Sequence, residues 1–181
     1  MTGMETPATP AAGTPAGRSC GTCTLCCKIL GVPEIAKPAD RWCRHVVQGK
    51  GCAIYASRPS QCRTFECLWL LEASLGPEWK PEKAKFVISS FDGQRLVAVC
   101  DPAAPHAWRG PAYYPQFKRW AELAGAGERQ VIVLSGRKAT VVLPGSDVEI
   151  TDVGPGDEII THKIHGPQGF TLRVEHKRKA G

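Results

Sequence analysis

The stretch that decides the fold covers residues 20–67 and reads CGTCTLCCKILGVPEIAKPADRWCRHVVQGKGCAIYASRPSQCRTFEC. It holds eight of the nine cysteines in the chain: Cys20, Cys23, Cys26, Cys27, Cys43, Cys52, Cys62 and Cys67. Thiols at this density indicate disulfides, a bound metal or redox catalysis. We interpret all eight as candidate metal ligands.

The composition of the whole chain limits the class of protein and the partners that we expect. Of the 181 residues, 43% are hydrophobic, which is ordinary for a globular protein with a core. No apolar run approaches the roughly 20 residues of a membrane span, so we expect no membrane partner. The net charge of +6 lacks the aromatic or motif support that nucleic-acid binding would need, so we expect no nucleic-acid partner either.

Composition also suggests boundaries along the chain. Residues 1–19 are rich in Thr, Pro, Ala and Gly and predict a disordered tail. They lack the basic start and apolar centre of a secretory signal, so we expect a cytoplasmic protein whose thiols stay reduced. A cysteine-cluster metal-binding domain is expected over residues 20–76. Residues 77–176 predict a β-rich region, which could be continuous with that domain, and residues 177–181 a basic tail.

Spacing limits how the clustered thiols can share a metal. On a helix, Cys20, Cys23 and Cys27 would form one stripe, and Cys26 would lie off it. Neighbouring side chains on a helix diverge by about 100°. The Cys26–Cys27 pair therefore indicates two adjacent metal positions, a polynuclear cluster, or one ligand beside a bystander.

Turn residues predict the local structure of the later cysteines. Two glycines in residues 48–51 favour a hairpin between strands at 42–47 and 52–55, which would bring Cys43 and Cys52 together. A helix is expected to start near Pro59 and run over residues 61–75. It would turn Cys62 inward and leave Cys67 facing elsewhere unless it begins irregularly. Arginines lie among the thiols, where they would offset thiolate charge: Arg41, Arg44, Arg58 and Arg63.

Two of these segments carry a resemblance to a known family. CGTCTLCC resembles the CxxCxxCC signature of the YkgJ-like cysteine-cluster family, described as zinc- or iron-chelating proteins, and GCAIYASRPSQCRTFEC looks like the rest of that signature. The similarity covers about residues 20–75, and residues 106–114 resemble a subgroup more loosely. It implies metal chelation by the eight cysteines. It implies no settled activity; some relatives resemble lysine N-methylases, but no cofactor-binding motif here supports methyl transfer.

Zinc and an iron–sulfur cluster compete as the cofactor. Eight thiols would make two closed zinc sites of four cysteines each. The C-x2-C-x2-C spacing of Cys20, Cys23 and Cys26 instead fits an iron–sulfur cluster with a distant fourth ligand, either Cys62 or Cys67. His45 is expected to be a strand residue rather than a ligand, since the thiols suffice. Cys100 is expected to be a small buried hydrophobe.

The second half predicts mostly antiparallel β structure with one short helix. Hairpins are expected around Asp92-Gly93 and Gly136-Arg137, a helix over residues 115–125, and short strands at 147–151, 158–163 and 170–176. Residues 101–115 predict an ordered loop packed on the core. His162, His165 and Glu158 could chelate a metal, but surface histidines are the better interpretation.

These observations predict a small α+β protein in which a metal-stapled cysteine-rich domain packs on the β-rich half. The first functional hypothesis is a metal-binding protein that chelates zinc or iron, with an iron–sulfur cluster as one form. One alternative is a redox or transferase enzyme that uses the cluster. The other is an interaction module with structural zinc, whose β half docks a protein partner.

Overall fold

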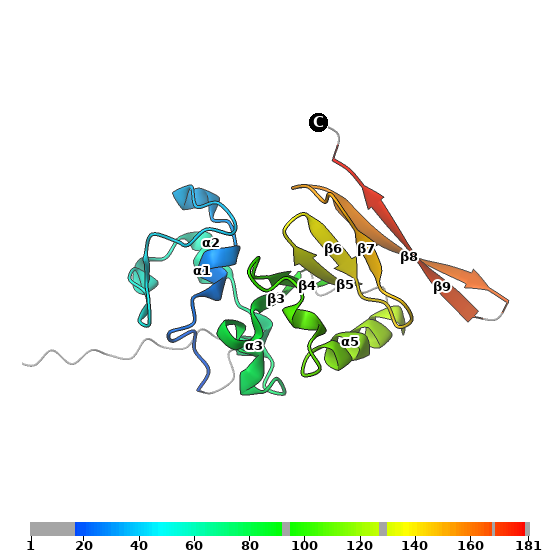
Figure 1. The fold of residues 1–181 in the computed structure, drawn as a ribbon, viewed down its shortest axis with the longest axis horizontal. Coiled ribbons are helices and arrows are strands. Elements are labelled where there is room, and N and C mark those ends of the chain that lie inside the picture. The colour runs from blue at the N-terminus through cyan, green and yellow to red at the C-terminus, as the bar shows by residue number, and fades with distance from the viewer. Residues whose placement is uncertain (1–16, 92–94, 127–129, 168, 180–181) are drawn as a thin grey trace, which may run out of the picture.

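The computed structural model describes residues 17–91, 95–126, 130–167 and 169–179. Over these residues the protein is a mixed α+β fold, as the sequence predicts (Figure 1). Most of the expected tail, the Asp92-Gly93 turn and the end of the basic tail lie outside the described residues. Among the described residues, no helix is both long and apolar enough to cross a membrane.

The centre of the fold is a five-stranded sheet whose strand order follows the chain. Its strands are β3 (Phe86–Phe91), β4 (Arg95–Cys100), β5 (Gln130–Ser135), β6 (Lys138–Val141) and β7 (Val148–Ile150). The predicted hairpins β3–β4 and β5–β6 are confirmed. The parallel pairing of β4 with β5 was not predicted, and the helix α5 (Tyr114–Ala126) lies in the crossover that it requires.

Alternation along the strands gives the sheet two apolar faces. Phe86 and Ile88 of β3 point into the core beneath α5, whereas Val87 between them points to the opposite face. The same division continues in β5, where Val131 faces α5 and Ile132 faces away. Both apolar faces must therefore be covered, and different parts of the chain cover the two faces.

The α5 face is covered by an aromatic cluster. Phe117 of α5 is 1% exposed, and its ring contacts Trp79, Phe86, Trp108 and Trp120 with centroids 5.4–6.1 Å apart. Trp108 lies in the short helix η4 (Ala107–Arg109) and is 2% exposed. The predicted packing of the 101–115 loop on the core is therefore confirmed.

The opposite face has two separate covers. Ile159 and Val174 of the hairpin β8 (Glu158–Gly166) and β9 (Gly169–Lys177) pack near Ile132. Val87 instead packs with residues of the cysteine-rich part of the chain. We call residues 20–76 the cysteine lobe; Figure 1 shows it beside one end of the sheet, with the β8–β9 ribbon projecting at the other.

The cysteine lobe contains only short elements. They are α1 (Leu25–Ile29), η1 (Pro33–Ile35), β1 (Val46–Val47), β2 (Gly51–Cys52), η2 (Tyr55–Ser57), α2 (Ser60–Thr64) and α3 (Leu68–Leu71). From the lobe, η3 (Pro77–Trp79) and α4 (Pro81–Ala84) lead into β3. The predicted single helix over 61–75 is wrong, because Phe65 and Cys67 adopt extended backbone angles that separate α2 from α3.

Arg18, just before the lobe, anchors the end of α3. Its guanidinium donates hydrogen bonds to the carbonyl oxygens of Trp69, Glu72, Ala73 and Leu75. The guanidinium carbon also lies 4.9 Å from the Trp69 ring centroid. Only Trp69 lies within α3, and the other three residues follow the helix, so Arg18 holds the chain where it leaves α3 and satisfies carbonyls that would otherwise need water.

An ion pair joins the lobe to the sheet. Lys28 Nζ in α1 lies 2.6 Å from Asp101 Oδ1, just after β4. Burial opposes ionisation of Asp101, but hydrogen bonds from Lys28 and from the Ala103 amide outweigh it and hold the pKa of this carboxyl below its usual range. The carboxylate is therefore favoured in the folded state.

We expect Asp101→Asn to lower the free energy of unfolding at pH 7 by about 1–3 kcal/mol, because a charged hydrogen bond is lost. Because the pKa of Asp101 is lower in the folded protein than in the unfolded chain, its carboxylate contributes its full stabilisation above the unfolded-state pKa of about 3.9. This contribution disappears as the pH falls through the folded-state pKa. The difference between the two proteins should therefore shrink below about pH 4. Urea unfolding at a series of pH values measures this difference in the free energy of unfolding.

Glu82→Gln, which removes the more exposed Lys80–Glu82 pair, is the matched control. It should cost under about 1 kcal/mol.

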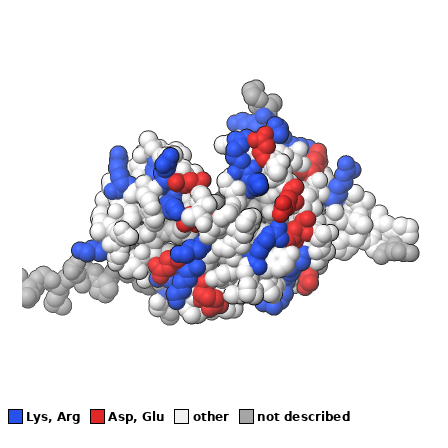
Figure 2. All heavy atoms as spheres, in the orientation of Figure 1, with Lys and Arg blue, Asp and Glu red and all other residues white. Residues whose placement is uncertain are grey.

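Charged side chains of both signs are interspersed over the face seen in Figure 2. Several form ion pairs, as where Asp147 accepts from Arg109 and Lys118 around the base of α5. Tyr114 also donates to Asp147 at 3.0 Å. This view of the molecule offers no continuous basic surface.

Candidate metal centre

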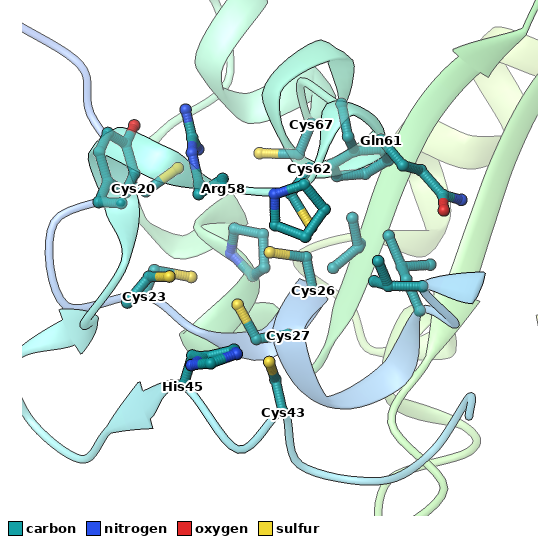
Figure 3. A pocket seen from close by; sticks show the side chains of 18 of the residues that line it. Cys20, Cys23, Cys26, Cys27, Cys43, His45, Arg58, Gln61, Cys62 and Cys67 are labelled. Carbon is teal, nitrogen blue, oxygen red and sulfur yellow. The ribbon is translucent and has the colours of Figure 1, made fainter. Parts of the chain in front are cut away.

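All eight clustered cysteines line one cavity of about 120 Å³ in the cysteine lobe. Figure 3 labels each of them except Cys52. They come from segments separated by up to 47 residues of sequence, between Cys20 and Cys67. The floor of the cavity includes Pro81 of α4 and Val87 of β3, so the sheet contributes to it. The fold thus gathers the predicted site residues in one place.

The first four cysteines do not lie on one helix. Helix α1 begins at Leu25, so it contains Cys26 and Cys27 but not Cys20 or Cys23. The expected single stripe is therefore wrong. Cys20 and Cys23 instead form a turn, in which the Cys23 amide donates to the Cys20 carbonyl at 2.9 Å.

The predicted hairpin is confirmed, but it is shorter than expected. Strands β1 and β2 pair only Val46 with Cys52 and Val47 with Gly51. Gly51 has φ +103°, and a Cβ there would lie 2.7 Å from the Gly21 carbonyl oxygen, so only glycine allows β2 to approach the Cys20–Cys23 turn. This close approach places Cys52 at the cavity.

Cys43 precedes the hairpin and is tied to α1 through its backbone. Its amide donates to the Cys27 carbonyl at 3.0 Å. His45 also lines the cavity, and its Nε2 accepts a 3.3 Å hydrogen bond from Arg44 Nε. The structure therefore puts an imidazole beside the thiols, although its expected role remains that of a non-ligand.

The break between α2 and α3 determines where Cys67 points. Cys62 lies within α2, while Cys67 stands in extended conformation immediately before α3 and is 9% exposed. A continuous helix would have turned Cys67 away from Cys62. The irregular backbone instead lets both thiols line the cavity.

The thiols differ in how readily they ionise. A hydrogen bond from Cys26 lowers the pKa of Cys27 to about 7, with help from the charges of Lys37 and Arg58. Donating that bond and being buried raise the pKa of Cys26. Burial likewise raises the pKa of Cys67 to about 11. Cys27 is therefore the readiest thiolate among these three.

Four arginines lie among the cysteines in the sequence, and Arg58 is the one that lines the cavity. Its guanidinium carbon lies 3.7 Å from the Tyr55 ring centroid, and its buried Nε has no hydrogen-bond partner among the described residues. Arg63 donates to the Arg58 carbonyl at 3.0 Å and so braces the same turn. A buried N–H without an acceptor is costly, so this atom needs a hydrogen-bond acceptor, and a thiolate or a water molecule would each serve.

The sulfurs do not yet form a ready-made site for one ion. Within residues 17–179, apart from the undescribed gaps, no three His, Cys, Asp or Glu side chains stand where they would already hold a metal ion. All nine cysteines are free thiols. The donor chemistry still suits a thiophilic metal, and the orphaned Arg58 Nε suits the negative charge that metal-bound thiolates carry.

The remaining cysteine and histidines lie apart from the cavity. Cys100 is 1% exposed in the core beneath α5, and burial with the nearby Asp101 charge raises its pKa to about 12. Its predicted role as a small buried hydrophobe is confirmed. His162 bonds Glu175 at 2.7 Å, and it lies three residues from His165 on strand β8, which puts the two rings on opposite faces. They cannot chelate one ion together.

In comparisons with known proteins, no family model matches the chain, and no curated protein or solved structure matches it. The functional assignment therefore depends on the chemistry of the cavity.

Proposed function

We propose that this protein binds a thiophilic metal through its eight clustered cysteines, as zinc or as iron in an iron–sulfur cluster. The single observation that carries the proposal is the convergence of all eight thiols on one cavity. Cysteines from separate turns, helices and strands of the lobe converge there, whereas Cys100 lies in the core beneath α5. Thiolate ligands are those that zinc and iron–sulfur clusters prefer.

The electrostatics of the cavity support this proposal. Four thiolates on one dication leave a net charge of about −2, which nearby cations must offset. Arg58 lines the cavity, and Lys37 lies close enough for its charge to lower the pKa of Cys27. The Lys37 ammonium is held in place by hydrogen bonds to the carbonyl oxygens of Lys28 and Leu30.

The resemblance to the YkgJ-like cysteine-cluster family agrees with this function and belongs to the same proposal. The proposal also includes a metal that staples the cysteine lobe together. It includes a cytoplasmic location as well, where a reducing environment would keep nine cysteines as thiols. A protein partner for the β-rich half and an enzymatic use of the metal stay predictions.

The deciding experiment is elemental analysis with a visible spectrum on protein purified without oxygen. About two zinc per chain and no colour would identify zinc bound by thiolates. Iron with acid-labile sulfide and broad visible absorption would identify an iron–sulfur cluster. A protein that contains neither metal, and takes up neither on reconstitution, would contradict the proposal.

Cys23→Ser is expected to remove metal and to destabilise the loaded protein by several kcal/mol, since a structural metal contributes folding free energy directly. Metal content and thermal unfolding measure both effects. Cys100→Ala is the matched control: it also removes a thiol, but one that does not line the cavity, and should keep the full metal content. Unchanged metal in Cys23→Ser would show that Cys23 is not a ligand.

A further inference from the structure

Arg58 does more than add positive charge to the cavity. We propose that its Nε–H donates a hydrogen bond to a sulfur of the bound metal centre, which makes Arg58 a positioning residue that raises metal affinity and tunes the sulfur–metal bonds. This inference rests on the proposed function. It names which of the four arginines acts on the metal centre, and it assigns the action to one N–H group rather than to the charge.

The backbone at Arg58 is held by the start of α2. Arg58 has the polyproline-like angles φ −54° and ψ 149°, which a residue before proline favours. The amides of Cys62 and Arg63 both donate to the Pro59 carbonyl at 3.0 Å. The Arg63 guanidinium also donates to the Arg58 carbonyl at 3.0 Å. The same turn therefore positions Arg58 and begins the helix that carries Cys62.

The side chain of Arg58 is held as well. Its guanidinium carbon lies 3.7 Å from the ring centroid of Tyr55 in η2. Stacking on an aromatic face fixes the guanidinium plane and leaves the N–H groups at its edge free to donate. Arg58 lines the cavity, and its buried Nε has no hydrogen-bond partner within the described part of the chain. Figure 3 shows this side chain at the wall of the cavity, among the thiols.

Sulfur is the acceptor that this cavity offers most. Apart from the cysteines, the described side chains that line it and can accept a hydrogen bond are His45, Tyr55 and Gln61. None of them is a partner of Arg58 Nε. A neutral thiol is a weak acceptor, whereas a thiolate accepts strong, charge-assisted hydrogen bonds. Metal binding deprotonates the thiols, so it converts weak acceptors around Arg58 into strong ones.

The other three arginines of the lobe are placed differently. Arg41 and Arg44 are exposed and do not line the cavity, and Arg44 uses its Nε to bond His45. Arg63 is exposed too, and its guanidinium acts on the backbone of Arg58. We therefore assign the contact with the metal centre to Arg58 among these four.

Arg58→Lys separates the hydrogen bond from the charge, because lysine keeps the positive charge but has no Nε–H. Co²⁺ is the probe, since thiolate-bound Co²⁺ absorbs light through sulfur-to-metal charge transfer. We expect Arg58→Lys to lower Co²⁺ affinity about tenfold in competition with a chelator, the usual scale when a hydrogen-bond partner of a metal ligand is lost. The charge-transfer band should move to lower energy, because the sulfur lone pairs lose the hydrogen bond that stabilised them.

Arg41→Lys is the matched control, since it makes the same change at an exposed arginine outside the cavity and should leave affinity and band unchanged. Wild-type affinity in Arg58→Lys would show that charge alone suffices. Weaker affinity with an unmoved band would show that the acceptor is water or backbone rather than sulfur. Either result would overturn the inference. If the protein takes up an iron–sulfur cluster, Arg58→Lys should lower its reduction potential, and an unchanged potential would count against the inference.

The wild-type protein supplies a measurement that does not depend on how a variant folds. In protein loaded with an NMR-active cadmium isotope, the Arg58 Nε proton should show scalar coupling to the metal, which a hydrogen bond to a metal-bound sulfur transmits. A loaded protein without this coupling would contradict the inference. Wild-type protein that takes up neither zinc, iron, cobalt nor cadmium would instead refute the proposed function itself.

Discussion

Chelating the proposed metal from the loaded protein is expected to unfold the cysteine lobe while the five-stranded sheet stays folded. The lobe has helices of at most five residues and one two-residue strand pair, elements that are unstable without tertiary support. Its buried cluster contains only five residues, one of which is Val87 from the sheet. Among the described residues, the core beneath α5 contains fourteen buried residues, of which only Leu75 comes from the lobe.

The expected effect is large, since structural zinc in small domains contributes about 10–16 kcal/mol of apparent binding free energy that is also folding free energy. Hydrogen exchange measures it by segment. Amides of α1, α2 and β2 should exchange rapidly after chelation, and amides of β4 and β5 should stay protected. Adding zinc back is the control and should restore protection if zinc is the native metal. Equal protection of the lobe with and without metal would show that the metal does not hold it together.

Phe117→Ala is expected to lower the free energy of unfolding by about 3–5 kcal/mol, the usual cost of removing a buried aromatic ring. Phe117 is 1% exposed and contacts four other aromatic rings, so the cavity left behind cannot readily collapse. Chemical denaturation of the sheet measures the loss.

Leu123→Ala on the same helix is the matched control. Its side chain is 72% exposed, so the change should stay within about 0.5 kcal/mol. Comparable losses in the two variants would contradict this prediction, because they would show that burial in the aromatic cluster does not set the cost of the Phe117 change.

Local signals in the sequence were sufficient for most of the sheet. The Gly136-Arg137 turn between two strand-like segments predicted the β5–β6 hairpin, and the structure confirms it. The parallel β4–β5 pair could not be read in the same way. It depends on α5 returning the chain across the sheet, a long-range packing event that leaves no turn motif at either strand.

The sequence predicted which residues form the candidate site, but it did not predict how the backbone arranges them. The density of thiols identified all eight cavity cysteines. Helical periodicity failed at Cys20 and Cys23, which precede α1, and at Cys67, where two extended residues interrupt the expected helix. Helix propensity is weak enough that packing of Cys67 into the buried cluster overrides it.

The strand order of the central sheet has a consequence for how the chain folds. Pairs β3–β4, β5–β6 and β6–β7 join near neighbours in sequence, so each can close quickly. The β4–β5 pair must bridge residues 101–129, and its closure loses more chain entropy. We expect the two halves of the sheet to form first and their docking, guided by Phe117 against Phe86, to limit the folding rate.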